Sequence, residues 1–247
     1  MSATHDEIDS PRPAGPRQAG SRLEWRKPMI GFAAVVASLL LLGIGSAQPA
    51  SSPSPPSAPV ARALVKVVVM GTFPESLLKP VETALEQELA VEVERIDGVA
   101  LPAFAYYPPR RRYRAERLLD FLNQHLRGEP RSTRVLGLTT VDISTTNGRY
   151  RDWGIFGLGE IGGRSCVVSS FRLGRGAAKR DQSLRQFRVA TTAVHEVGHT
   201  LGLQHCTEPR CLMRDAEGSI ETVDTSDGHL GPRCMARLER HAPKTER

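Results

Sequence analysis

Three histidines and one glutamate stand at metal-site spacing in residues 195–205, which read HEVGHTLGLQH. Residues four apart share one face of a helix, so His195 and His199 can direct both imidazoles at one metal ion. Glu196 lies about 100° further round the helix. From there it can reach a metal-bound water without being a ligand itself. This placement is typical of a general base.

Gly202 and His205 complete the pattern. Glycine lets the chain leave the helix, with a positive φ expected at Gly202, so that His205 returns as the third nitrogen ligand. Three neutral imidazoles with one open position are the zinc arrangement that lowers the pKa of bound water to about 7. The alternative is a helix that carries histidines for other reasons. The added glycine and third histidine favour one catalytic zinc per chain.

An uncharged stretch runs from Pro28 to Ala61, and within it Met29 to Ala47 is an apolar run. As a helix this run would rise about 28 Å, enough to cross most of a bilayer core. The basic residues before it favour a cytoplasmic N-terminus and an exported remainder. We expect an uncleaved single-pass anchor. Because Gly45-Ser46-Ala47 resembles a signal-peptidase site, a cleaved signal and a secreted protein remain the alternative.

These features divide the chain into four parts. Residues 1–27 are expected to be a disordered cytoplasmic tail, and residues 28–47 the membrane anchor or signal segment. Residues 48–62 are rich in proline and serine, cannot bury a core and are expected to be an extended linker. Residues 63–243 are expected to form one domain of ordinary size.

Arginines gather at positions 110, 111, 112, 114 and 117, in a chain whose net charge is +6. Such a cluster can bind nucleic acid. No aromatic-rich RNA-binding pattern and no zinc-finger spacing accompanies it. We therefore expect a solvated basic face and no nucleic-acid partner.

Strand and helix patterns alternate along the predicted domain. Short β-branched or alternating apolar runs predict strands at 64–70, 89–96, 135–143, 155–161 and 165–173, the last two joined as a hairpin by Gly162-Gly163. Helical spacing of apolar residues predicts helices at 75–89, at 113–126 and from about Ser183 through the histidine motif. The predicted fold class is α/β (α+β), a twisted mixed sheet backed by helices with a small irregular C-terminal part.

The motif and the residues after it resemble the archaemetzincin family. That family carries HExxHxxGxxH followed by cysteine, four residues, Cys-x-Met, seventeen residues and Cys-x-x-Cys. Here Cys206, Cys211 and Met213 occupy the matching positions, and Cys234 ends the pattern. The upstream segment Phe156-Gly157-Leu158 is also similar to the family.

The resemblance implies a metzincin-like fold and zinc-dependent hydrolysis of peptide bonds. Glu196 would be the catalytic general base, and Met213 the methionine of the turn beneath the metal. Residues 155–161 would correspond to the sheet edge on which metzincins bind extended peptides by backbone pairing. Two alternatives stay open, a catalytically silent zinc-binding scaffold domain and a zinc amidase acting on non-peptide amides. The presence of Glu196 counts against a silent domain.

The chain departs from the family at Gly231, where the family has the first cysteine of its last pair. A structural zinc normally has four ligands, and glycine offers none. His229 is the nearest candidate for a replacement, with a solvated loop histidine as the alternative. We therefore expect a second, structural zinc to be lost or much weakened.

Oxidation to a disulfide is an alternative to metal binding for the remaining cysteines. Outside the cytosol neighbouring thiols tend to oxidise, so Cys206 or Cys211 could form a disulfide with Cys234 in place of a metal site. Cys166 lies in a predicted strand and is expected to be a buried thiol.

Overall fold

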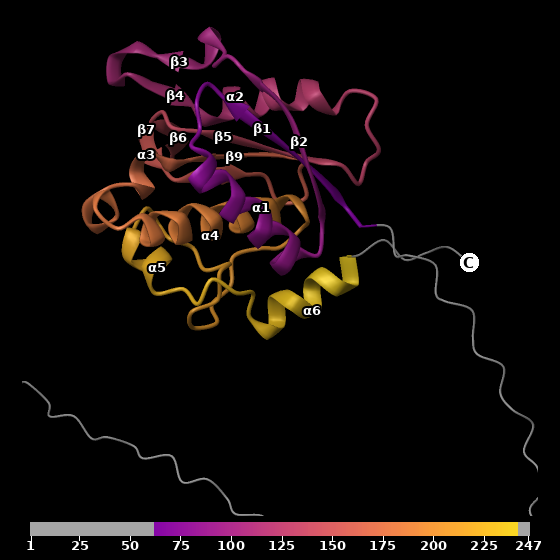
Figure 1. Cartoon of the computed structure of the whole chain (residues 1–247). Coiled ribbons are helices and arrows are strands. Elements are labelled where there is room, and N and C mark those ends of the chain that lie inside the picture. Colours follow the sequence, from indigo (N-terminus) through magenta and orange to yellow (C-terminus); the bar gives the residue numbers. More distant parts are fainter. Residues whose placement is uncertain (1–61, 242–247) are drawn as a thin grey trace, which may run out of the picture. The chain divides into compact units, whose positions relative to one another are not determined.

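The computed structural model of the protein describes residues 62–241, whose helices and strands are shown in Figure 1. The predicted tail, apolar segment and nearly all of the linker lie outside the described residues. Within residues 62–241, no helix is both long enough and apolar enough to cross a membrane.

The main sheet has five strands in the order β2-β1-β5-β9-β8. Neighbouring strands from β2 to β9 are parallel, whereas β8 pairs antiparallel with β9 and lies at one edge. The predicted mixed sheet is therefore confirmed. The bounds of its strands are Leu64–Met70 (β1), Glu92–Val99 (β2), Arg134–Thr139 (β5), Gly157–Gly159 (β8) and Ser165–Ser169 (β9).

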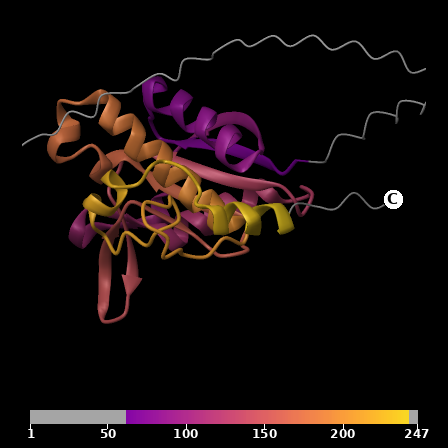
Figure 2. The ribbon, with the colours of Figure 1, turned by 90° about the horizontal axis from the view of Figure 1, so that it is seen from below.

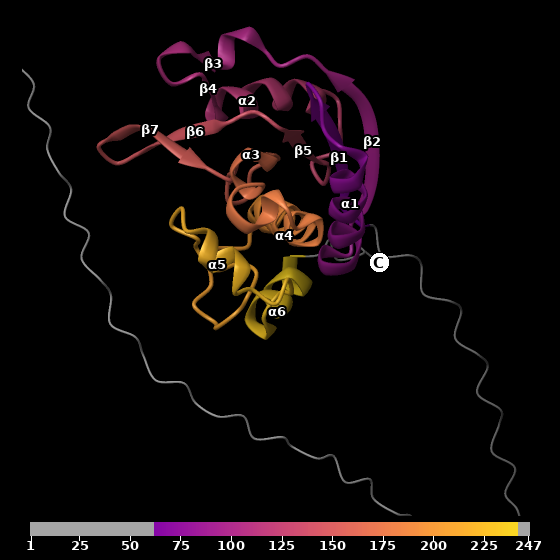
Figure 3. The same cartoon turned by 60° about the vertical axis from the view of Figure 1, so that its left-hand side comes forward.

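Helices cover both faces of this sheet. α1 (Glu75–Leu89) and α4 (Gln182–Thr200) lie on one face and α2 (Ala115–Leu122) lies on the other (Figures 1 and 3). Figure 2 shows α1, in indigo and purple, beside the orange α4. Successive strand residues point to opposite faces. Accordingly Val65 and Val67 belong to the core with α1 and α4, whereas Val68 belongs to the core with α2.

A second sheet has four strands in the order β3-β4-β6-β7. Its antiparallel β6 and β7 extend outward as a hairpin (Figure 3). The sequence prediction joined residues 135–143 into one strand, but β5 ends at Thr139 and β6 begins in the other sheet. Asp142, between them, accepts hydrogen bonds from Arg112 (2.8 Å) and Arg172 (2.7 Å), which hold the turn. The strand bounds are Tyr106–Tyr107 (β3), Arg112–Arg114 (β4), Ile143–Asn147 (β6) and Tyr150–Ile155 (β7).

The arginine cluster is only partly solvated. Arg112 pairs with Asp142 and Asp152, and Arg114 pairs with Glu116, so their side chains are only 18% and 15% exposed. The remaining three arginines of the cluster are exposed. The prediction of a wholly solvated basic face is wrong for the two that hold the second sheet together.

Other element boundaries also differ from the prediction. β2 begins at Glu92, three residues later than expected, and the predicted helix at 113–126 is divided into β4, α2 and a 3₁₀ turn. The predicted strand at 165–173 stops at Ser169, whose hydroxyl accepts the Phe171 N–H (3.1 Å) and caps a short helix. The remaining helices are Ser170–Leu173 (α3), Ile220–Asp224 (α5) and Pro232–His241 (α6), and the 3₁₀ turns are Ala103–Ala105, Pro108–Arg110, Asn123–Leu126 and Gly176–Lys179.

Close packing of α2 on the sheet predicts that Gly137→Ala destabilises the domain. A Cβ at Gly137 would lie 2.6 Å from Cδ1 of Leu122 and 2.7 Å from Cε of Met70, both buried. Overpacking of this kind costs about 1–3 kcal/mol of unfolding free energy, measurable by urea denaturation. Gly98→Ala is the control, because its Cβ would meet nothing closer than 3.5 Å. Equal stability of the two variants would contradict this packing.

Candidate active site

The histidine motif lies in the buried C-terminal half of α4. The helix begins after Asp181, whose carboxylate accepts the Leu184 N–H at 2.9 Å, close to the predicted start near Ser183. From Arg188 to Thr200 every residue except His195 is buried, and His195 is half-buried. Gly202 has a φ of 91°, as expected for the turn that returns the chain to His205.

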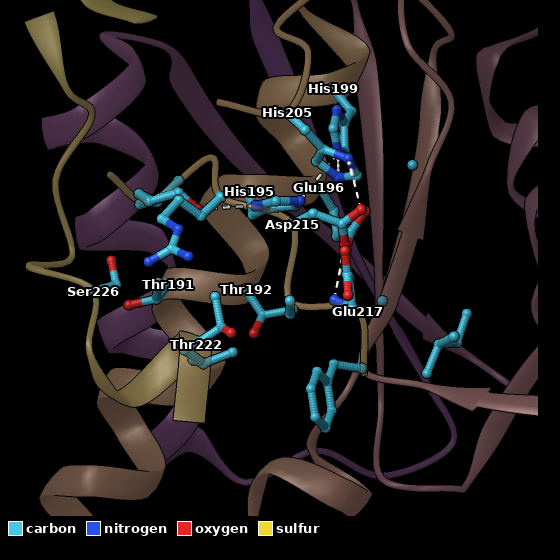
Figure 4. A pocket seen from close by; sticks show the side chains of 18 of the residues that line it. Thr191, Thr192, His195, Glu196, His199, His205, Asp215, Glu217, Thr222 and Ser226 are labelled. Atoms are coloured by element: carbon cyan, nitrogen blue, oxygen red, sulfur yellow. Dashed lines mark hydrogen bonds and ion pairs between the residues drawn. The ribbon is translucent and has the colours of Figure 1, made fainter. Parts of the chain in front are cut away.

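The three imidazoles of the motif converge on one point (Figure 4). The Nε2 atom of His199 lies 3.0 Å from that of His195 and 3.2 Å from that of His205. Three nitrogens bound to one tetrahedral zinc at its usual bond length stand about 3.3 Å apart. The donor set and its spacing therefore fit a zinc ion.

Each imidazole is held through its other nitrogen. His195 Nδ1 lies 2.9 Å from the Leu212 carbonyl oxygen and His199 Nδ1 lies 2.8 Å from that of Leu203. Because a carbonyl only accepts, both Nδ1 atoms must carry the proton, which leaves Nε2 free to bind metal. His205 Nδ1 lies 3.1 Å from a carboxylate oxygen of Asp215. Such outer partners fix the tautomer and the ring orientation.

Electrostatics keep the two helix-borne imidazoles neutral. Burial, reinforced by the neighbouring His199, lowers the pKa of His195 from 6.5 to about 4. Burial also lowers the pKa of His199. A metal-binding imidazole must be unprotonated, so this environment suits a ligand at neutral pH.

Glu196 is buried beside the histidines but does not belong to their cluster. Burial raises the pKa of its carboxyl from 4.5 to about 8, against the opposing effect of a hydrogen bond from the Gly159 N–H. A nearby cation favours the ionised form. A metal on the three Nε2 atoms would therefore bring this carboxyl towards the state that a general base needs.

Two glycines of the edge strand β8 make room for Glu196. A Cβ at Gly157 would lie 2.6 Å from Cγ of Glu196, and a Cβ at Gly159 would lie 2.6 Å from its backbone oxygen. Any side chain at either position would have to displace the glutamate or the helix that carries it. The glycines of β8 therefore position Glu196.

A cleft of about 290 Å³ opens in front of these groups. One wall is residues 155–159 of the edge strand, and the other is the segment 211–226. Two threonines of α4, Thr191 and Thr192, extend the lining away from the histidines, together with Thr222 and Ser226 (Figure 4). No tyrosine of the described domain lines the cleft.

Met213 lies under the turn of α4 that carries the histidines. Its side chain is fully buried, and its sulfur would be 2.9 Å from a Cβ placed at Gly198. The Met213 carbonyl also accepts the Cys206 N–H at 2.8 Å. Both contacts agree with the position that the resemblance implied.

The structure brings Cys206, Cys211 and Cys234 together and leaves Cys166 apart, buried in β9. Burial and the two adjoining thiols raise the pKa of the Cys234 thiol. His229, expected as the nearest replacement ligand, is not among them. Its side chain is 73% exposed and bonds Glu88 at 2.7 Å. The structure therefore shows the solvated loop histidine that was given as the alternative, and not a metal ligand.

Sequence reasoning located the histidines and Glu196 but missed what holds them. Asp215, Gly157 and Gly159 carry no motif of their own, and the carbonyls of Leu203 and Leu212 carry no side-chain signal. Besides the family resemblance of Phe156-Gly157-Leu158, the available signal was the repeated glycine spacing in residues 156–159, which is typical of a strand approached closely by another backbone.

Comparison with known proteins finds relatives of this chain. The model of peptidase family M54 matches residues 87–240. The archaemetzincin of Halobacterium salinarum is 29% identical over 176 residues, which cover 69% of this chain and 96% of that protein.

Two crystal structures of archaemetzincins share the fold. The Methanopyrus kandleri structure is 33% identical with a TM-score of 0.62, and the match covers 73% of this chain and 95% of that one. The Archaeoglobus fulgidus structure is 28% identical with a TM-score of 0.59, covering 70% of this chain and 99% of that one.

The contact between β8 and α4 predicts that Gly157→Ala impairs catalysis while leaving metal binding intact. The three heavy atoms nearest to the added methyl group all belong to the Glu196 side chain, at 2.6 to 2.9 Å, so the methyl group would displace this carboxylate first. Misplacement of a catalytic group by about 1 Å can lower the rate by about 10²-fold. Peptide hydrolysis and zinc content should be measured together, with Gly98→Ala as a remote control. A Gly157→Ala variant with wild-type kcat would show that the glycine does not position the glutamate.

Proposed function

The chain belongs to the archaemetzincin family, peptidase family M54, and is a zinc metallopeptidase; on this premise we propose that Glu196 is its general base. The convergence of three Nε2 atoms at tetrahedral spacing beside a buried carboxylate carries the proposal. His195, His199 and His205 would hold the zinc. One side of the cluster faces the cleft, where a water and a substrate carbonyl can approach.

Each group then has a distinct task. Zinc, when bound, supplies a Lewis acid that polarises the attacking water and the substrate carbonyl. Glu196 accepts a proton from that water and returns it to the leaving amine. Burial of Glu196 excludes competing solvent from its carboxylate, and the Gly159 N–H orients it. Asp215 holds the exposed imidazole of His205 in place.

The edge strand β8 is a suitable binding site for an extended peptide. It pairs with β9 on one side only within the described sheet, and its residues line the cleft. A peptide can add to such an edge through backbone hydrogen bonds, with its side chains directed alternately into pockets. This supports a peptide substrate whose scissile bond passes in front of the three histidines.

The proposed roles predict different outcomes for a base variant and a ligand variant. Glu196→Ala should retain zinc and lose turnover by about 10²-fold or more, the scale for a positioned general base. His199→Ala should lose both zinc and activity, as should the wild-type protein after chelation. A peptide library, followed by mass spectrometry, measures cleavage, and elemental analysis measures zinc.

Glu239→Ala is the matched control, because Glu239 is an exposed glutamate of α6. Wild-type activity in Glu196→Ala would refute its role as base. A wild-type protein that holds zinc but cleaves nothing in a broad library would favour the silent scaffold domain instead.

We also propose that the peptidase domain is exported and held at the membrane by residues 29–47. This rests on the uncharged apolar run and the basic residues before it. The full-length protein should remain in the membrane pellet after a carbonate wash, and added protease should reach its catalytic domain only from the outer side. Release by carbonate would contradict an anchor, and a mature N-terminus at Gln48 would identify a cleaved signal.

A further inference from the structure

A second cluster of metal-ligand groups lies where the chain after α4 meets the start of α6. The sulfur atoms of Cys206, Cys211 and Cys234 lie within 4.8 Å of one another, and those of Cys211 and Cys234 are 3.8 Å apart. Two thiolates bound to one tetrahedral zinc stand about 3.8 Å apart, given the usual zinc–sulfur bond. The three thiols therefore lie close enough together to share one metal ion, and the Cys211–Cys234 pair already has the spacing of two zinc ligands.

Glu208 fills the position that a side chain at residue 231 would take. A Cβ at Gly231 would lie 2.2 Å from Oε2 of Glu208 and 3.3 Å from Sγ of Cys211. The same Oε2 is 3.8 Å from Sγ of Cys206. A carboxylate oxygen and a thiolate on one tetrahedral zinc stand about 3.5 Å apart. The carboxylate thus lies beside the thiols, although it is not within 4.8 Å of all three sulfur atoms. A rotation of the Glu208 side chain towards the thiols would bring it to the fourth corner, which the sequence prediction of a weakened site left empty.

The surroundings of the cluster suit bound anionic ligands. The Glu208 N–H donates to Sγ of Cys206 at 3.4 Å, and the Gly231 N–H donates to Sγ of Cys211 at 3.2 Å. Arg233 approaches the outer oxygen of Glu208, Oε1, at 3.4 Å, and its N–H donates to Oε2 at the same distance. These outer contacts orient ligands and offset negative charge, as second-shell groups do at metal sites.

We propose that Glu208 takes the place of the family cysteine missing at Gly231, so that it completes a structural zinc site with Cys206, Cys211 and Cys234. The site would tie the segment after α4 to α6. Cys206 follows His205 directly, and Cys211 precedes Leu212, whose carbonyl accepts from His195. The second metal would therefore fix two backbone segments that position the catalytic histidines. The second zinc site does not depend on the role proposed for Glu196 in peptide hydrolysis.

Cobalt substitution of the full-length protein separates the two metal sites. A Co²⁺ ion held by three imidazoles gives no thiolate-to-metal charge-transfer absorption, whereas one held by three thiolates does. The wild-type protein, purified in detergent with its thiols kept reduced, should bind two metal ions per chain, one of them with this absorption.

Variants then test Glu208 itself. Glu208→Ala should weaken metal binding at the thiolate site by at least about 10-fold, whereas Glu239→Ala should leave it unchanged. In the double variant Glu208→Ala/Gly231→Cys the new cysteine enters the space that the carboxylate vacates. This variant should restore binding and strengthen the charge-transfer absorption, which a merely destabilised loop would not do.

Three results would overturn the proposal. The first is one metal ion per chain without thiolate absorption in the wild type. The second is an unchanged affinity of the thiolate site in Glu208→Ala. The third is a disulfide between Cys234 and either other cysteine, found by non-reducing mass spectrometry after thiols are blocked at lysis.

Discussion

The imidazoles and the carboxylate that α4 carries into the interior have their partners outside the helix. Its own backbone N–H and carbonyl groups are used within the helix, and its C-terminal half is buried. The imidazoles of His195 and His199 therefore bond carbonyls of Leu212 and Leu203, and Glu196 bonds the edge strand. These bonds link α4 to the segment 203–212 that follows it and to the edge strand β8 that precedes it. They also explain why the chain after α4 follows a path set by hydrogen bonds more than by helices or strands.

The edge strand allows its contact with Glu196 by having almost no side chains on the side that faces α4. With glycine at positions 157 and 159, the backbone of β8 approaches the helix closely enough to enclose Glu196. The same strand ends the sheet and forms a wall of the cleft. Positioning the Glu196 carboxylate and leaving a free backbone edge beside the cleft are thus two results of one close contact. A residue larger than glycine at position 157 or 159 would affect both the position of Glu196 and the strand edge beside the cleft.

Periodicity explains which parts of the fold were predictable. β1, α1 and α4 follow apolar patterns with the period of their own secondary structure, and their bounds match the prediction closely. The predicted strand at 135–143 failed because Asp142 interrupts it through ion pairs with Arg112 and Arg172, which come from distant segments. The predicted strand at 165–173 ends early because the Ser169 hydroxyl accepts the Phe171 N–H and caps a short helix. Contacts between residues that are distant in sequence leave no periodic pattern in the sequence.

The candidate site also has a part that the sequence pattern predicts and a part that it does not. Helical geometry fixes His195, Glu196 and His199 relative to one another, so their spacing was sufficient to predict their arrangement. Glu208 and Asp215 lie in a segment without regular structure. Only the folded structure shows that Glu208 contacts the thiol of Cys206 and that Asp215 contacts His205. The chain in this segment alternates between the histidine cluster and the cysteine cluster. Cys206 follows His205, and Cys211 precedes Leu212, whose carbonyl accepts from His195. A loop held at such short intervals has little freedom to move a catalytic ligand, even though few of its residues lie in helices.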